Sequence, residues 1–526
     1  MTYTSFAYFV FLLCLVIIYF VVPKKVQWVV LLVGSYFFYY IAAGLSAIAF
    51  LVITTISLFF AGRIMGRFNQ IQGRKLARTE DSDKKISIKR FYTRRKRITM
   101  LAGLLLNFGI LAVLKYGGFV TFNINTLFNT HIGVPSFLLP LGISFYTFQA
   151  TGYIIDVYRG KYDPDSNIFK FALFTSFFPQ IVQGPISRHD QLAHQLYAER
   201  KFDWLSAKYG VELMLWGLFK KLVIADRAVV FVNYTLDHSQ DIHGLQTIVS
   251  CLIYMAYIYA DFSGGIDISR GICQVFGIEM AENFRRPYFS MSMTEYWRRW
   301  HMTLGAWMRD YIFYSIMFSK SFGRMGKSLR SKVGKYWSGA IPACIATGIT
   351  FMVVGIWHGA AWQYIAFGAY NSVCLMLETL FTGRLTEWNN KHKFINTKAF
   401  SWRIFMTLMT FIVIFFSKFF TMSHGAAQAL HMIKSIFSSF HPGIIFDGTL
   451  FNMGLSKGSF FVLLMSIFVF FIVSLMQESG IKLREAIDRQ NLIFRWLIYL
   501  AAVFSILTLG VYGPAVSESM FIYQQF

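Results

Sequence analysis

Residues 6–22 read FAYFVFLLCLVIIYFVV, an unbroken apolar run that Lys24 and Lys25 follow. A helix of about 20 apolar residues crosses the hydrocarbon of a bilayer, so this run predicts a membrane span. No basic region precedes the run, and no small-residue cleavage site separates it from the lysine pair. We therefore expect it to remain in the mature protein instead of serving as a cleaved signal peptide.

Similar apolar runs recur along the whole chain. They lie at residues 26–43, 45–62, 99–115, 136–157, 170–186, 210–232, 246–278, 337–357, 361–381, 404–422, 459–476 and 493–512. Only 14% of the residues are charged, whereas about 25% are charged in ordinary soluble domains. The sequence predicts an all-α polytopic membrane protein with about eleven transmembrane helices, and also re-entrant or interfacial helices because several runs contain polar residues.

The distribution of charge predicts the orientation. Thirteen Lys or Arg residues stand between Arg63 and Arg97, in a chain of net charge +24. Since Lys and Arg accumulate in cytoplasmic loops, residues 63–98 are predicted to be cytoplasmic. Three spans precede this loop, which predicts an N-terminus outside a multi-pass protein of the cytoplasmic membrane.

One membrane domain over residues 1–526 is the simplest organisation. It would comprise N-terminal spans at 1–62, the basic cytoplasmic loop at 63–98, a catalytic core at 99–380 and C-terminal spans at 381–526. A nucleic-acid partner is not expected, because the basic residues flank apolar spans instead of forming one solvated face. Contact with membrane lipids is the expected use of the basic clusters. The five cysteines lack CxxC spacing and predict neither a zinc site nor a disulfide framework.

A polar, tryptophan-rich segment interrupts this pattern after residue 281. From Thr294 to Tyr314 it lacks proline, and apolar residues at spacings of three and four predict one amphipathic helix with a stripe formed by Trp297, Trp300, Leu304 and Trp307. His301 would lie beside this stripe and face protein. An interfacial helix with Trp and Arg at headgroup level would give the same pattern.

A second histidine, His358, lies at predicted membrane depth in the sequence Gly355-Ile-Trp-His-Gly359. Burial of an ionisable group in a membrane bundle costs free energy that a partner or a function must offset, although a hydrogen-bonded core histidine remains possible. Flanking glycine would let a substrate approach the imidazole closely. Two histidines without matched carboxylates or thiols make a poor zinc site, whereas one neutral imidazole suffices as a general base, so we predict no metal.

Four stretches of the chain carry a family resemblance. They are FPQIVQGPI at 178–186 with Arg188, DFSG at 261–264 with ENFRRP at 282–287, YWRRWH at 296–301 continuing to Tyr311, and WHGAAW at 357–362; the closing residues 521–526 add to them. In this order they closely resemble the membrane-bound O-acyltransferase (MBOAT) family, and within it the bacterial alginate O-acetyltransferase-like branch. The sequence departs from that branch at 314–323 and at Asn371 and Ser372.

The resemblance implies an enzyme, an O-acyltransferase. His358 corresponds to the catalytic histidine of the family and His301 to its second characteristic position, and the candidate substrate-binding residues are Trp300, Arg299, Arg298, Trp357 and Asn283. The family implies no bound cofactor. The expected donor is a cytoplasmic acyl thioester, either acetyl-CoA or a carrier-protein thioester. Arg298, Arg299 or backbone amides near His358 could all stabilise the oxyanion.

The predicted reaction is O-acetylation of an extracytoplasmic polysaccharide of the cell envelope, as in alginate-like biosynthesis. The branch also implies an extracytoplasmic acyl-transfer partner that is SGNH-like and passes the group to the glycan acceptor. The alternative in the same class is D-alanyl transfer to teichoic acid from a carrier-protein thioester. A transporter or lipid flippase is the alternative of another class, and it predicts paired broken helices in two halves.

Overall fold

The computed structural model describes residues 2–135, 137, 139–438 and 442–512, so the predicted closing motif at 521–526 lies outside the described residues. The described residues form helices and no strand apart from one isolated β-bridge. Contacts divide the chain into two compact units. The first unit comprises Met1–Met214 and Ser269–Ala281, and the second comprises Leu215–Ile268 and Glu282–Phe526.

The first unit holds most of the N-terminal helices. They are α1 (Phe6–Val21), α2 (Gln27–Ala77), α3 (Ser82–Phe128), α4 (Ile143–Arg159), α5 (Ile168–Ser176), α6 (Phe178–Ile181), α7 (His189–Tyr197) and the greater part of α8 (Trp204–Leu218). Within α2 the backbone leaves helical geometry at Gly44, where φ is 81°. Glycine tolerates this conformation, so the helix bends at the position that separates the predicted spans 26–43 and 45–62.

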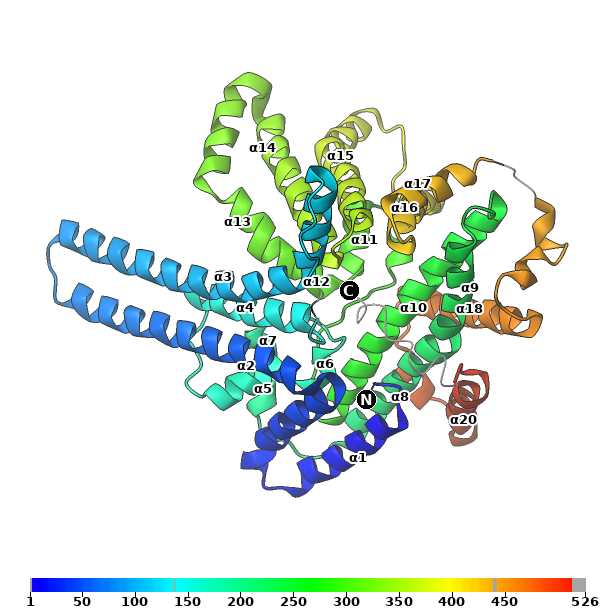
Figure 1. Cartoon of the computed structure of the whole chain (residues 1–526), viewed down its shortest axis with the longest axis horizontal. Coiled ribbons are helices and arrows are strands. Elements are labelled where there is room, and N and C mark those ends of the chain that lie inside the picture. The colour runs from blue at the N-terminus through cyan, green and yellow to red at the C-terminus, as the bar shows by residue number, and fades with distance from the viewer. Residues whose placement is uncertain (1, 136, 138, 439–441, 513–526) are drawn as a thin grey trace. The chain divides into compact units, whose positions relative to one another are not determined.

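Residues 63–98, the predicted basic loop, are helical over most of their length. Helix α2 continues to Ala77 and α3 begins at Ser82, so the two form a long helical hairpin (Figure 1). Lysine, arginine and glutamine are good helix formers, which explains why this charged stretch stays helical. Asp81 caps α3 by accepting a hydrogen bond from the backbone N–H of Asp83 at 2.9 Å.

The second unit holds the remaining helices. They are a π-helix (Phe219–Ala225), α9 (Asp226–Asp237), most of α10 (Leu245–Val275), α11 (Met293–Arg299), α12 (Met302–Met308), a second π-helix (Arg309–Phe313), α13 (Tyr314–Met317), α14 (Lys320–His358), α15 (Trp362–His392), α16 (Phe400–Met422), α17 (Ala426–Ser435), α18 (Lys457–Glu478), α19 (Leu483–Asp488) and α20 (Leu492–Leu509). Helices α14 and α15 pack against each other as an antiparallel pair (Figure 1).

Eight of the described helices are long and apolar enough to cross a membrane: α2 with the short turn before it, α3, α10, α14, α15, α16, α18 and α20. Many of their large apolar side chains point outward, as in Leu105, Phe468 and Phe504, each more than half exposed. An outer surface of this kind suits lipid and not water. The prediction of an all-α multi-pass membrane protein is confirmed.

Candidate active site

The segment around His301 is not the single amphipathic helix that the sequence predicts. Helix α11 ends at Arg299 and α12 begins at Met302, with Trp300 and His301 between them. His301 has φ 46° and ψ 53°, which is the left-handed region. The apolar periodicity is present, but the helix breaks inside it.

A preceding stretch of chain causes this break. Phe284 forms an isolated antiparallel bridge with Trp300, and the backbone N–H of Arg285 donates to the Arg299 carbonyl at 2.9 Å. The Asn283 carbonyl accepts a hydrogen bond from the Met302 N–H at 2.9 Å. These bonds engage backbone groups on both sides of the turn and hold it open.

The side chain of Asn283 orients His301. Its Oδ1 accepts hydrogen bonds from the backbone N–H and the Oγ1 of Thr303, at 3.1 and 2.9 Å, and lies 3.2 Å from His301 Nδ1. An amide oxygen only accepts, so Nδ1 carries the imidazole proton and Nε2 presents its lone pair. Asn283 was predicted to bind substrate, and its position is that of a residue that fixes a histidine tautomer.

His301 is neutral at ordinary pH. Its side chain is 2% exposed, and burial lowers the pKa of the imidazole to about 3. The ring packs edge-on against Phe262 and Trp357, with centroid distances of 4.8 and 5.8 Å. The Trp357 ring thus lies between His301 and His358, which follows Trp357 in the sequence.

His358 is the last residue of α14 and is 7% exposed. The chain leaves the helix at Gly359, and an added Cβ there would stand 2.3 Å from the Tyr364 ring, so a larger residue would have to displace that ring. The imidazole packs against three rings, those of Trp357, Tyr364 and Phe367, with centroid distances of 5.0, 6.3 and 5.3 Å. The two predicted catalytic histidines therefore lie in one aromatic cluster, on either side of Trp357.

A small cavity opens beside His358. It is lined by Tyr254, Ile258, Trp300, His358, Tyr364, Phe367, Lys418 and Thr421. Lys418 comes from α16 and is 2% exposed, with its Nζ 4.3 Å from the centroid of the Trp300 ring. Of the predicted residues, His358 and Trp300 line the cavity. Lys418 was missed, although a charge inside the apolar run 404–422 is the signal that could have revealed it.

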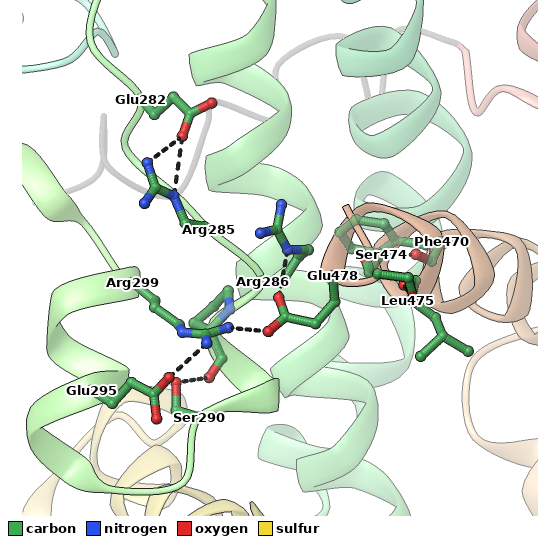
Figure 2. Close-up of polar contacts among 12 residues, drawn as sticks. Glu282, Arg285, Arg286, Ser290, Glu295, Arg299, Phe470, Ser474, Leu475 and Glu478 are labelled. Atoms are coloured by element: carbon green, nitrogen blue, oxygen red, sulfur yellow. Dashed lines mark hydrogen bonds and ion pairs between the residues drawn. The ribbon is translucent and has the colours of Figure 1, made fainter. Parts of the chain in front are cut away.

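The predicted arginines lie elsewhere in the second unit. Arg299 Nη2 is 2.6 Å from a Glu295 oxygen and its Nη1 is 2.9 Å from Glu478 at the end of α18. Arg286 also contacts Glu478, with Nε 2.7 Å from Oε2 (Figure 2). Arg298 is exposed. Arg286 thus links the turn before α11 to α18, and Arg299 links α11 itself to α18. Neither Arg298 nor Arg299 is among the residues that line the cavity.

Comparison with known proteins identifies the family that this chain resembles. Residues 163–422 match the model of MBOAT, the membrane-bound O-acyltransferase family, which confirms the predicted resemblance; this range contains both histidines and Lys418.

Three curated relatives represent the similarity to individual proteins. The chain is 32% identical to the probable alginate O-acetylase AlgI of Pseudomonas syringae pv. tomato over 64% of its length and 60% of the relative. It is 28% identical to the peptidoglycan O-acetyltransferase of Helicobacter pylori over 61% and 62% of the two chains. It is 26% identical to the teichoic acid D-alanyltransferase of Bacillus subtilis over 52% and 65%. The chain thus spans less than two thirds of the length of these relatives.

Proposed function

We propose that the protein transfers an acyl group, most simply acetyl, from a thioester to a hydroxyl. The reason is that residues 163–422 match the model of the membrane-bound O-acyltransferase family. The observation that carries the proposal is the burial of His358 beside a cavity that an aromatic cluster and Lys418 enclose. A water-poor site favours acyl transfer to a bound hydroxyl over hydrolysis of the thioester.

His358 would act as the general base. Its imidazole takes the proton of the acceptor hydroxyl while the hydroxyl oxygen attacks the thioester carbonyl carbon, and the imidazolium then gives this proton to the departing thiolate sulfur. Proton transfer of this kind contributes about 10²- to 10⁴-fold in rate. His301 would not share this role, because a pKa of about 3 leaves it a weak base. It would instead hold Trp357, and thereby His358, in place.

The acceptor would be an extracytoplasmic glycan, and the donor a cytoplasmic acyl thioester such as acetyl-CoA. Support comes from the relatives: the alginate O-acetylases are 32–34% identical to this chain, whereas the teichoic acid D-alanyltransferases are 26–29% identical. D-alanyl transfer from a carrier-protein thioester stays the second candidate on that ground. An SGNH-like extracytoplasmic partner, an N-terminus outside and a single catalytic core over 99–380 belong to the same proposal.

Thiol release from acetyl-CoA tests the proposal. Membranes that contain the wild-type chain should release free thiol in the presence of envelope glycan, and His358→Ala should lower this rate by about 10²- to 10⁴-fold at equal abundance. His392→Ala is the control, because His392 is an exposed histidine at the end of α15. Equal rates for His358→Ala and wild type, with both proteins folded, would contradict the role of His358.

A further inference from the structure

Lys418 is a buried lysine that has no carboxylate partner in the part of the chain that the structure describes. Among the residues that the structure describes, its Nζ has neither a carboxylate at ion-pair distance nor a hydrogen-bond acceptor, and its contacts are the rings of Trp300 and Tyr296, at 4.3 and 5.7 Å. The other buried lysines of the second unit are paired: Lys220 Nζ lies 2.6 Å from Asp267, and Lys221 Nζ lies 2.7 Å from Asp261.

An unpaired ammonium inside a membrane protein is costly, because the charge loses its water. The face of Trp300 offsets part of this cost, since the electron-rich face of an aromatic ring attracts a cation. The remaining cost of burying the ammonium indicates a function, and the position of Lys418 indicates which function. Its side chain and that of His358 line the same small cavity.

The geometry points to Lys418 as the residue that stabilises the oxyanion of the acyl-transfer intermediate in the cavity beside His358. This assignment rests on the proposed function. When the acceptor hydroxyl oxygen bonds to the thioester carbonyl carbon, the π electrons of the C=O bond move to the carbonyl oxygen. His358 takes the proton of the acceptor hydroxyl. The negative oxygen accepts a hydrogen bond from the Lys418 ammonium, which keeps its protons. The C=O bond then re-forms, the C–S bond breaks, and the sulfur takes the proton from His358.

Two other features of the site favour this assignment over the arginines. Arg299 already binds two carboxylates, and Arg298 is exposed, so neither is available in the cavity. A preorganised donor in a low-dielectric site acts most strongly where charge develops, and it is worth about 10²- to 10³-fold in rate. Lys418 is a donor already placed at the cavity and is buried from water, and no ion pair has to break before it can act.

Lys418→Met tests the assignment, because it removes the ammonium and keeps most of the volume. We expect kcat for thiol release from acetyl-CoA to fall about 10²- to 10³-fold with little change in KM, since the lost interaction forms only in the transition state. The melting temperature should stay equal or rise, because an unpaired buried charge is lost. Lys418→Arg should retain part of the rate. Lys457→Met is the control: Lys457 also lies over a ring, 5.6 Å from the Phe451 centroid, but it is exposed.

Several outcomes would overturn the assignment. A wild-type kcat in Lys418→Met would do so, and so would a raised KM with unchanged kcat, which would make Lys418 a donor-binding residue. A lower melting temperature with the rate lost equally in Lys418→Arg would make it structural. If Lys418→Met does not accumulate, Lys418→Gln is assayed by the same criteria. His358→Ala is measured in parallel: an active His358→Ala contradicts the proposed function, whereas an inactive His358→Ala with an active Lys418→Met contradicts the Lys418 assignment alone.

Discussion

At the scale of the residue, His301 makes stability depend on pH. In the unfolded chain its imidazole binds a proton below pH about 6.5, whereas in the folded protein it stays neutral down to pH about 3. The unfolded state therefore binds more protons between these values. Stability should fall as pH drops below 6.5, by up to about 1.4 kcal/mol per pH unit, and His301 should contribute nothing to this dependence above pH 6.5.

We expect His301→Gln to weaken this dependence. The melting temperature of the purified protein should drop less between pH 7 and pH 5 in His301→Gln than in wild type. His392→Gln should keep the wild-type dependence, because His392 is exposed. An identical drop in His301→Gln and wild type would show that His301 is not held neutral.

The sequence predicts the two histidines better than it predicts their surroundings. His301 and His358 stand in patterns that a reader can find along the chain, and the structure places both in one aromatic cluster. Lys418 stands far from both in sequence, and only the packing of α16 brings it over Trp300. Arg299 appeared free to bind a substrate because its partner Glu478 lies in another helix.

At the scale of the element, two glycines allow α14 and α15 to approach closely. A Cβ added at Gly355 would stand 2.6 Å from the Gly368 Cα and 2.5 Å from the Tyr364 carbonyl oxygen. Small residues at a helix crossing permit such contacts inside membranes. Because the obstructing atoms are backbone, they cannot move aside without separating the two helices.

We expect Gly355→Leu to separate α14 from α15 and to displace His358, which lies one turn further along α14. The melting temperature should fall, since overpacking costs about 1–3 kcal/mol, and acyl transfer should be lost. Gly339→Leu is the matched control, because no atom lies within 4 Å of a Cβ added there in the same helix. Equal melting temperatures and rates for the two variants would contradict the close approach.

The sequence predicts most helices but not where they break. The apolar runs mark α10, α14, α15, α16 and α18 to within a few residues at most ends. The break at Trp300 and His301 depends on hydrogen bonds from residues 283–285, which no local pattern reveals. The charges of residues 63–98 predict a side of the membrane and no secondary structure, although Lys, Arg and Gln favour the helix that the structure shows there.

At the scale of the whole molecule, the basic hairpin tip gives a test of orientation. Residues 78–81 join α2 to α3, and the proposed topology puts them in the cytoplasm. A cysteine introduced by Glu80→Cys, in a chain with Cys14→Ser, should react with an impermeant maleimide only after the membrane is opened. Labelling of intact cells would reverse the orientation of the first spans, and with it the side from which the donor is expected.

The central claim is that His358 catalyses acyl transfer to an envelope glycan. The most direct measurement is the ester content of that glycan in cells that lack the native gene and express either wild type or His358→Ala at equal abundance. The account predicts ester with wild type, none above background with His358→Ala, and matched melting temperatures of the two purified proteins. Ester at the wild-type level in cells with a folded His358→Ala protein would contradict it.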